Sequence, residues 1–146
     1  MRIVTERPPN FAKIAAVFDL RRYPGAIFCY GDTIFNPSGN KLSDALVAHE
    51  AAHGARQGTD PDVWWDRYIA DKTFRLEEEI VAHRVEWRRF CTDDPNRHER
   101  RRYLAAIAGR LNFPLIIEFQ LSYALIAFHA TAASCSRYLS GPASGR

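Results

Sequence analysis

The chain has 146 residues, of which 47% are hydrophobic and 25% are charged, a composition that is ordinary for a globular domain. We predict a single domain over residues 1–146, with loose ends at 1–8 and 140–146. The formal net charge of +3 is too weak to indicate nucleic acid as a partner by itself, so nucleic acid is not expected to bind.

The N-terminus and the cysteines both indicate a reducing compartment. Charges and two prolines stand where a secretory signal would need an unbroken apolar stretch. The three cysteines, Cys29, Cys91 and Cys135, are far apart and form no CxxC pair, which argues against a disulfide framework or a thiolate zinc site. We therefore expect a cytoplasmic protein with reduced thiols.

The first half of the chain predicts a helix, two short strands and a second helix. The first helix is expected over residues 9–20, and the strands over 26–30 and 33–35, around the turn Gly31-Asp32. Ser43 is a suitable N-cap for the next helix, which should end near Gln57 because Gly58 follows.

The second half predicts helices only. Asp60-Pro61 is a cap followed by proline at the first helical position, and it opens a short helix. A further helix is expected over residues 73–90, and Asp94-Pro95 repeats the cap signal before the next one. One face of that helix is apolar and carries Leu104, Ile107, Ala108 and Leu111. The whole pattern predicts an α+β class, mostly α, with a short antiparallel β element before the helix that Ser43 caps.

Residues 114–133 form the most apolar stretch and the one candidate for a membrane span. They contain Glu118, Gln120 and His129, and a carboxylate is costly in lipid. We interpret the stretch as a helix buried in the domain or as a surface for self-association, and expect no membrane contact.

The segment "HEAAH" at residues 49–53 fits the pattern H-E-x-x-H. Histidines four residues apart lie on one face of a helix, so His49 and His53 can both bind a single ion. Glu50 is turned by about 100° from His49, which places its carboxylate beside the ion. The alternative is a helix in which two histidines are so spaced by chance.

A third ligand is expected from the helix over residues 73–90. Glu79 shares one helical face with three residues that follow it, and we predict that it is the third ligand, since catalytic zinc sites usually have three protein ligands. The alternative for the run at 77–79 is a solvated face, and Glu78 points away from Glu79. The residues that share the face of Glu79 are Ala82, His83 and Glu86.

His49-Glu50-x-x-His53 followed by Glu79-x-x-Ala82 resembles the gluzincins, the zincin-like metallopeptidases whose third ligand is a glutamate. The short chain is similar to small ImmA/IrrE-type peptidases and to metallopeptidases encoded by phages and prophages. The resemblance covers roughly residues 26–111, and it departs at His83, where the pattern more often has Asp or Asn. It implies a zincin-like fold in which an edge strand lies against the cleft and can accept an extended peptide.

Such a site implies one Zn²⁺ per chain and a peptide or protein substrate. Zinc lowers the pKa of its bound water, and Glu50 would act as the general base. An oxyanion donor or second-shell partner is also needed, and the candidates are His83, Tyr30 and Tyr68. Asp44 or Glu86 could bond the far nitrogens of the histidines, and the sequence does not choose between them.

Two other features have competing interpretations. Adjacent Trp64 and Trp65 point in different directions on a helix, so we expect one in the core and the other partly exposed; a substrate wall is the alternative. The arginines near residues 88–102 are most simply a solvated helix face.

Three functions therefore stay open. The first is a zinc metallopeptidase. The second is a catalytically silent zincin-like protein of a virion or phage assembly complex, and the third is a nucleic-acid-associated factor that uses the arginine-rich helix. A phage protein would act in the host cytoplasm or the virion.

Overall fold

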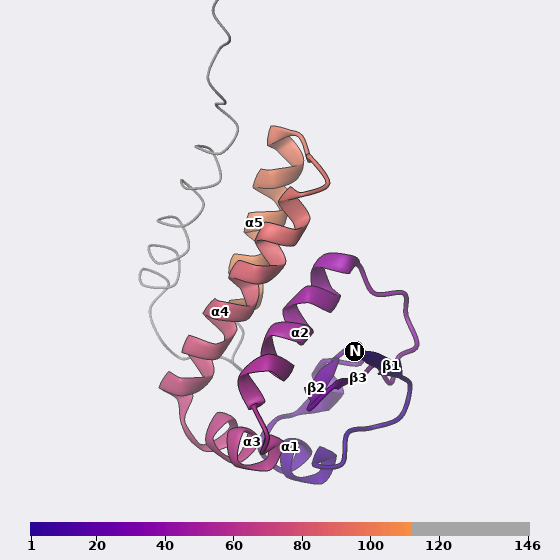
Figure 1. Ribbon diagram of the computed structural model, residues 1–146, viewed down its shortest axis with the longest axis vertical. Coiled ribbons are helices and arrows are strands. Elements are labelled where there is room, and N and C mark those ends of the chain that lie inside the picture. The colour runs from indigo at the N-terminus through magenta and orange to yellow at the C-terminus, as the bar shows by residue number, and fades with distance from the viewer. Residues whose placement is uncertain (112–146) are drawn as a thin grey trace, which may run out of the picture.

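The computed structural model describes residues 1–111, and it shows a mostly helical protein with one small mixed sheet (Figure 1). The predicted α+β class, mostly α, is therefore confirmed. No helix within residues 1–111 is long and apolar enough to cross a membrane. The predicted helix from Pro114, with Glu118, Gln120 and His129, lies outside the described residues, as do Cys135 and the end at 140–146.

The sheet has three strands in the order β1-β3-β2. The expected hairpin is present: β2 (Phe28–Tyr30) pairs antiparallel with β3 (Thr33–Phe35) around Gly31-Asp32. β1 (Arg2–Val4) lies on the other side of β3 and runs parallel to it. The prediction of a loose end over residues 1–8 was therefore wrong, because the backbone of this segment completes the ladder of β3.

The first helix is shorter than predicted, and it packs against β2 and the tryptophans of the next helix but one. α1 (Phe11–Val17) ends in an extended residue, and a 3₁₀ turn, η1 (Leu20–Arg22), follows. Ile14 of α1 is buried against Phe28 and both tryptophans. Trp64 and Trp65 are 7% and 6% exposed, so the expectation that one of them would be partly exposed was wrong.

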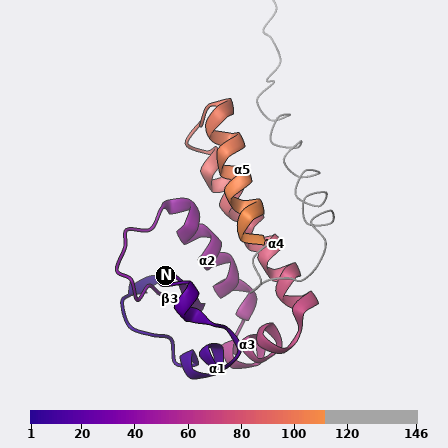
Figure 2. The same cartoon turned by 180° about the vertical axis from the view of Figure 1, so that it is seen from behind.

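Helix α2 (Asp44–Gln57) lies between the sheet and α4 (Lys72–Cys91), as Figures 1 and 2 show from opposite sides. Its ends are as predicted: the Ser43 side chain accepts a hydrogen bond from the backbone of Leu46, and Gly58 terminates the helix with a φ of 61°. At Gly54 a methyl carbon would lie 2.6 Å from the carbonyl oxygen of Gly31. Only glycine permits the hairpin to approach α2 so closely.

Helix α3 (Pro61–Ala70) links α2 to α4. Asp60 caps α3 by accepting from the Val63 backbone, and Asp71 caps α4 by accepting from the backbone of Thr73 and Phe74. Ala82 of α4 is fully buried where α4 packs against α2. Two short, capped turns therefore bring α4 back alongside α2.

Helix α5 (Arg97–Leu111) runs along α4 on the side away from the sheet (Figure 2). Its cap is Asn96 rather than the predicted Asp94-Pro95. The Asn96 side chain accepts from the Glu99 backbone, and the Glu99 carboxylate accepts from the Asn96 backbone, which makes a capping box. Ile107 and Leu111 are buried against Trp87 of α4, as the predicted apolar face requires.

Candidate metal centre

Three side chains from two helices converge in the interior. His49 and His53 of α2 place their Nε2 atoms 3.2 Å apart. A carboxylate oxygen of Glu79, from α4, lies 3.6 Å from the Nε2 of His49, and the other oxygen lies 3.3 Å from that of His53. Ligands held tetrahedrally at ~2.1 Å from an ion lie about 3.4 Å from one another. The three groups therefore have the spacing that one bound metal ion requires.

The site is deeply buried, and its charges suit a cation. All three residues are 6–7% exposed. Burial lowers the pKa of His49 to about 4, which keeps its ring neutral. Burial by itself would raise the pKa of Glu79, but the facing rings of His53 and His49 lower it far below its usual range. Burial lowers the pKa of His53, but the Glu79 carboxylate more than offsets this, so the pKa is raised and an ion would displace a proton from this ring. With His49 neutral and Glu79 ionised, these residues could hold a metal ion.

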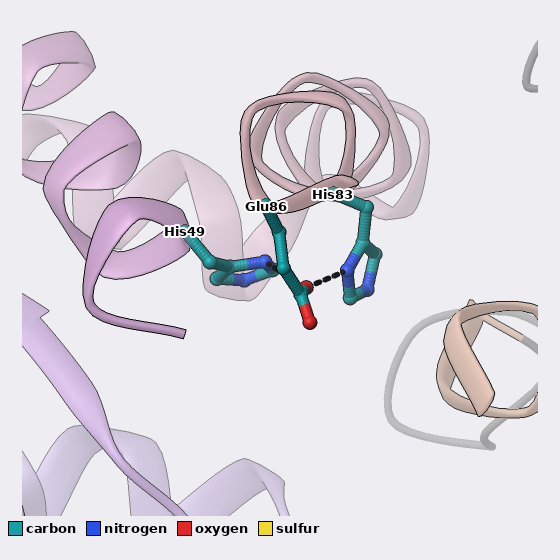
Figure 3. Close-up of side chains that lie close together, drawn as sticks. All are labelled: His49, His83 and Glu86. Carbon is teal, nitrogen blue, oxygen red and sulfur yellow. Dashed lines mark hydrogen bonds and ion pairs between the residues drawn. The ribbon is translucent and has the colours of Figure 1, made fainter. Parts of the chain in front are cut away.

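Glu86 holds His49 in place from behind (Figure 3). The Nδ1 of His49 donates to Oε2 of Glu86 over 3.1 Å, which leaves its Nε2 unprotonated and aimed at Glu79. The other carboxylate oxygen of Glu86 accepts from the Tyr103 hydroxyl over 2.8 Å and from Arg110. Four donors thus occupy this buried carboxylate, and the hydrogen bond to His49 fixes the tautomer that a metal needs.

The structure therefore decides between the two partners that the sequence left open. Asp44 lies at the start of α2 and pairs with Arg89 at 2.5 Å, so it is remote from the histidine rings. His49, His83 and Glu86 also form a compact group in Figure 3. Its atoms are 2.7 and 3.1 Å apart, which are hydrogen-bond lengths, so we interpret it as the support of the first group.

His83 occupies a supporting position beside Glu79. Its Nδ1 donates to Glu86 over 2.7 Å, and its Nε2 is buried 3.8 Å from a Glu79 oxygen, with no hydrogen-bond partner among the described residues. A ring that gives its Nδ1 proton to Glu86 has no second proton for an oxyanion while it is neutral. Of the two roles predicted for His83, its position therefore suits that of a supporting partner.

The two tyrosines differ in their relation to the site. Tyr68 donates its hydroxyl to Glu79 over 2.5 Å, so it supports the third ligand directly. Tyr30 lies at the hairpin end of β2, where its hydroxyl interacts with Asp62 of α3. Tyr30 is not among the residues that line the cavity, and its predicted part in the site stays a prediction.

Glu50 faces a cavity of about 430 Å³ that also contains His49, His53 and Glu79. No described residue donates a hydrogen bond to its carboxylate. Burial raises the pKa of Glu50 to about 7. A carboxyl group that gains and loses its proton near neutral pH is suited to general acid–base chemistry. Aromatic side chains form much of the cavity wall: Phe18, Tyr23, Phe28, Trp64, Trp65 and Tyr68.

The edge strand predicted by the family resemblance lines this cavity, but part of its edge is taken. β2 is an edge of the sheet, and Phe28 and Cys29 contribute to the cavity wall. The carbonyl oxygen of Cys29 accepts from Nε2 of Gln57 over 2.8 Å and from Nε1 of Trp65 over 3.0 Å. Both of its lone pairs are therefore occupied, and an added peptide strand cannot bond there.

The acidic run at 77–79 divides among three environments. Glu79 enters the site, and Glu77 is exposed. Glu78 is 1% exposed and forms two hydrogen bonds of 2.5 Å with the guanidinium of Arg56. The expected solvated face is therefore wrong for Glu78, which joins α4 to α2 by a charge pair.

A search of protein-family models, curated proteins and solved structures found no match to this chain. The resemblance to zincin-like peptidases therefore stays a prediction. The sequence did not predict Tyr103 and Arg110, which support Glu86 from α5, a helix expected to contribute only its apolar face to the interior. Arg75 was not predicted either, although this residue lies four positions before Glu79, and that spacing was a usable signal.

Proposed function

We propose that the protein is a zinc-dependent hydrolase of peptide bonds, of the small phage or prophage type that its motifs resemble. One observation carries the proposal: His49, His53 and Glu79 converge at metal-ligand spacing in the same cavity that holds Glu50. Two histidines and one glutamate are a ligand set of catalytic zinc sites, which keep a further position open.

The residues of the chain divide the work. His49, His53 and Glu79 would hold the ion, and Glu86 and Tyr68 orient two of these ligands. Zinc in such a site supplies Lewis acidity and makes water a nucleophile at neutral pH. Glu50 would accept a proton from that water and return it to the leaving amine, which its pKa of about 7 suits.

Metal content is the first test. The purified full chain, dialysed and analysed for elements, is expected to retain one zinc per chain. His53→Ala and Glu79→Gln should each lose it, because each removes one of three ligands. Native protein that contains no zinc after expression with ample metal, or that retains iron in its place, would contradict the zinc assignment.

Hydrolysis is the second test, and it separates an enzyme from a silent scaffold. Glu50→Gln is expected to retain zinc and to lose at least about 100-fold in the rate of cleavage of a fluorogenic peptide library. Glu77→Gln removes an exposed carboxylate of α4 and is the matched control, with an unchanged rate. If zinc-loaded native protein cleaves no peptide, or if Glu50→Gln cleaves as fast as the native chain, the peptidase proposal fails.

A further inference from the structure

A second charged group lies in the wall of the cavity that holds the metal ligands. Arg75 of α4 lines the same cavity as Glu50 and Glu79, although it is only 4% exposed. It precedes Glu79 by four residues on α4, so it lies on the same face, one helical turn of about 5.4 Å away. A guanidinium therefore lies in the wall of the cavity that holds the proposed site of reaction.

Part of Arg75 has a structural role. Its Nη1 donates to the backbone carbonyls of Tyr68 and Ile69, over 3.0 and 3.2 Å, and so satisfies the last turn of α3. Its guanidinium carbon lies 4.9 Å from the ring centre of Phe18 and 5.6 Å from that of Tyr68. These contacts fix the plane of the side chain against the cavity wall.

One further donor of this group has no partner among the described residues. The Nε of Arg75 is buried and makes no hydrogen bond with any described residue. Its guanidinium forms no ion pair within residues 1–111, although burial lowers its pKa and the carboxylates of Glu79 and Asp71 act against that lowering from a longer distance. The other guanidinium in the wall, Arg110, is by contrast paired with Glu86. A buried cation without an anion is costly, so an unpaired one at a cavity indicates an anionic occupant.

A second unpartnered donor lies in the same wall. The Nε1 of Trp64 is buried without a hydrogen-bond partner among residues 1–111, and Trp64 is stacked on Tyr68 with ring centres 4.8 Å apart. Two buried donors without partners, on residues of a largely aromatic wall, suit a ligand with acceptor oxygens and an apolar body. A planar carboxylate fits a guanidinium better than other anions do, because it accepts two parallel hydrogen bonds.

We propose that Arg75 binds a carboxylate of the substrate, next to the bond that is cleaved. The inference deepens the proposed function and takes its reaction from there, but the anion site itself does not depend on turnover. The carboxylate can come from a free C-terminus or from an acidic side chain in the same position. The protein is accordingly a binder of short apolar peptides that carry a carboxylate beside the scissile bond.

Binding of a small probe tests the anion site without any turnover. The probe is 3-phenylpropionate, with 3-phenylpropionamide as its neutral match, titrated into zinc-loaded and metal-free full-length protein. We expect the carboxylate to bind both forms, and Arg75→Met to weaken its binding about ten- to hundred-fold. Arg88→Met, at an exposed arginine of the same helix, is the matched control and should leave the affinity unchanged.

A direct signal from the native side chain covers the case in which Arg75→Met does not fold. Arg75→Lys identifies the Nε–H resonance of Arg75 by its disappearance from the spectrum. On titration of the native chain with phenylpropionate, this resonance should shift and become protected from exchange, and the amide should leave it unmoved. Binding of the carboxylate with no change at Nε–H, or equal binding of both probes, would overturn the inference.

Peptides with an N-terminal block then distinguish the two sources of carboxylate. A free C-terminus, its amide, and an amidated peptide with glutamate in the last position are compared for cleavage. Preference for the first indicates a terminal carboxylate, and preference for the third indicates an acidic side chain. Cleavage of all three at equal rates would retain the hydrolase and remove the role of Arg75. Binding of the carboxylate without any cleavage would retain the anion site at Arg75 and contradict the proposed hydrolase.

Discussion

The two sides of the His49 ring differ in how completely their polar groups are satisfied. On the Nδ1 side, Glu86 accepts from two histidines, Tyr103 and Arg110, so every strong acceptor site of this buried carboxylate is used. On the Nε2 side, burial and nearby charges act on the Glu50 carboxyl but no hydrogen bond from residues 1–111 does. The Nε of Arg75 is unpartnered within the same residues.

The difference divides the site into a support side, the satisfied network around Glu86, and an open side, the unpartnered groups around Glu50 and Arg75. Buried polar groups are normally satisfied, and a satisfied network holds its members in one geometry. Groups left without partners reduce stability, and they are expected where a ligand supplies the missing contacts. His49 therefore marks the boundary between a rigid support and a site that is completed by an ion and a substrate.

Removal of the ion should have the largest effect on stability, because the buried ligands on the Nε2 side of His49 then lose the contacts that the ion supplies. Chelation of zinc is expected to lower the melting temperature by about 10 °C or more, since an ion bound only by the folded state stabilises it. Differential scanning calorimetry with and without chelator measures this, and Glu79→Gln should show little further response to chelator. Equal melting temperatures in the native protein would mean that these residues hold no ion.

Glu50 should make the metal-free protein less stable as pH rises. Burial raises its pKa in the folded protein to about 7, above the usual value of 4.5, so between these values the unfolded chain releases a proton that the folded chain retains. Stability is therefore lost from pH 4.5 to pH 7. Glu50→Gln should stabilise the metal-free protein by about 3 kcal/mol at pH 8 and hardly at all at pH 4.

The free energy of unfolding of the native protein and of Glu50→Gln, both metal-free, is measured with denaturant between pH 4 and pH 8. A pH-independent difference between them would show that the Glu50 carboxyl ionises in the folded protein as it does in water. Glu77→Gln, at an exposed site, is the control and should follow the native curve.

Weakening the support side should have an intermediate effect. Glu86→Gln removes the charge that four donors share, and loss of such a partner typically lowers metal affinity about 10- to 100-fold. Competition with a chromophoric chelator measures the affinity. Glu78→Gln is the matched control on the same helix: it should cost about 1 kcal/mol of stability, through the pair with Arg56, and leave zinc affinity unchanged. Equal losses of affinity would contradict the division.

Tyr68→Phe should have the smallest effect. It removes one hydrogen bond to Glu79 and leaves the aromatic stack in place, so zinc affinity should fall about 5-fold. Tyr30→Phe should not alter it, because the Tyr30 hydroxyl lies toward Asp62. A change in Tyr30→Phe as large as that in Tyr68→Phe would show that the effect is not local to Glu79.

Features set by local sequence could be predicted. The N-caps at Ser43 and Asp60, the stop at Gly58 and the hairpin at Gly31-Asp32 each follow from neighbouring residues, and all are present. The convergence of His49, His53 and Glu79 followed from helical spacing plus the assumption that the two helices face each other.

Features that depend on tertiary packing could not be predicted from the sequence. Nothing near Arg2–Val4 indicates that β3 needs a second partner, because that need arises from the sheet. Tyr103 and Arg110 stand in an arginine-rich helix whose pattern is that of a solvated face, and only the placement of α5 on α4 brings them to Glu86. The choice of Glu86 over Asp44 likewise depends on which residue of α4 lies behind His49.

The hydrogen bonds from α5 to Glu86 bear on when, during synthesis and folding, the metal site is completed. Synthesis delivers both histidines of α2 early, but the donors that complete the Glu86 network, Tyr103 and Arg110, are among the last of the described residues to be made. Until α5 docks, the His49 ring has a partly supported partner. Ion capture is therefore expected late in assembly, and nascent chains halted before residue 97 should exchange zinc faster than those that include α5.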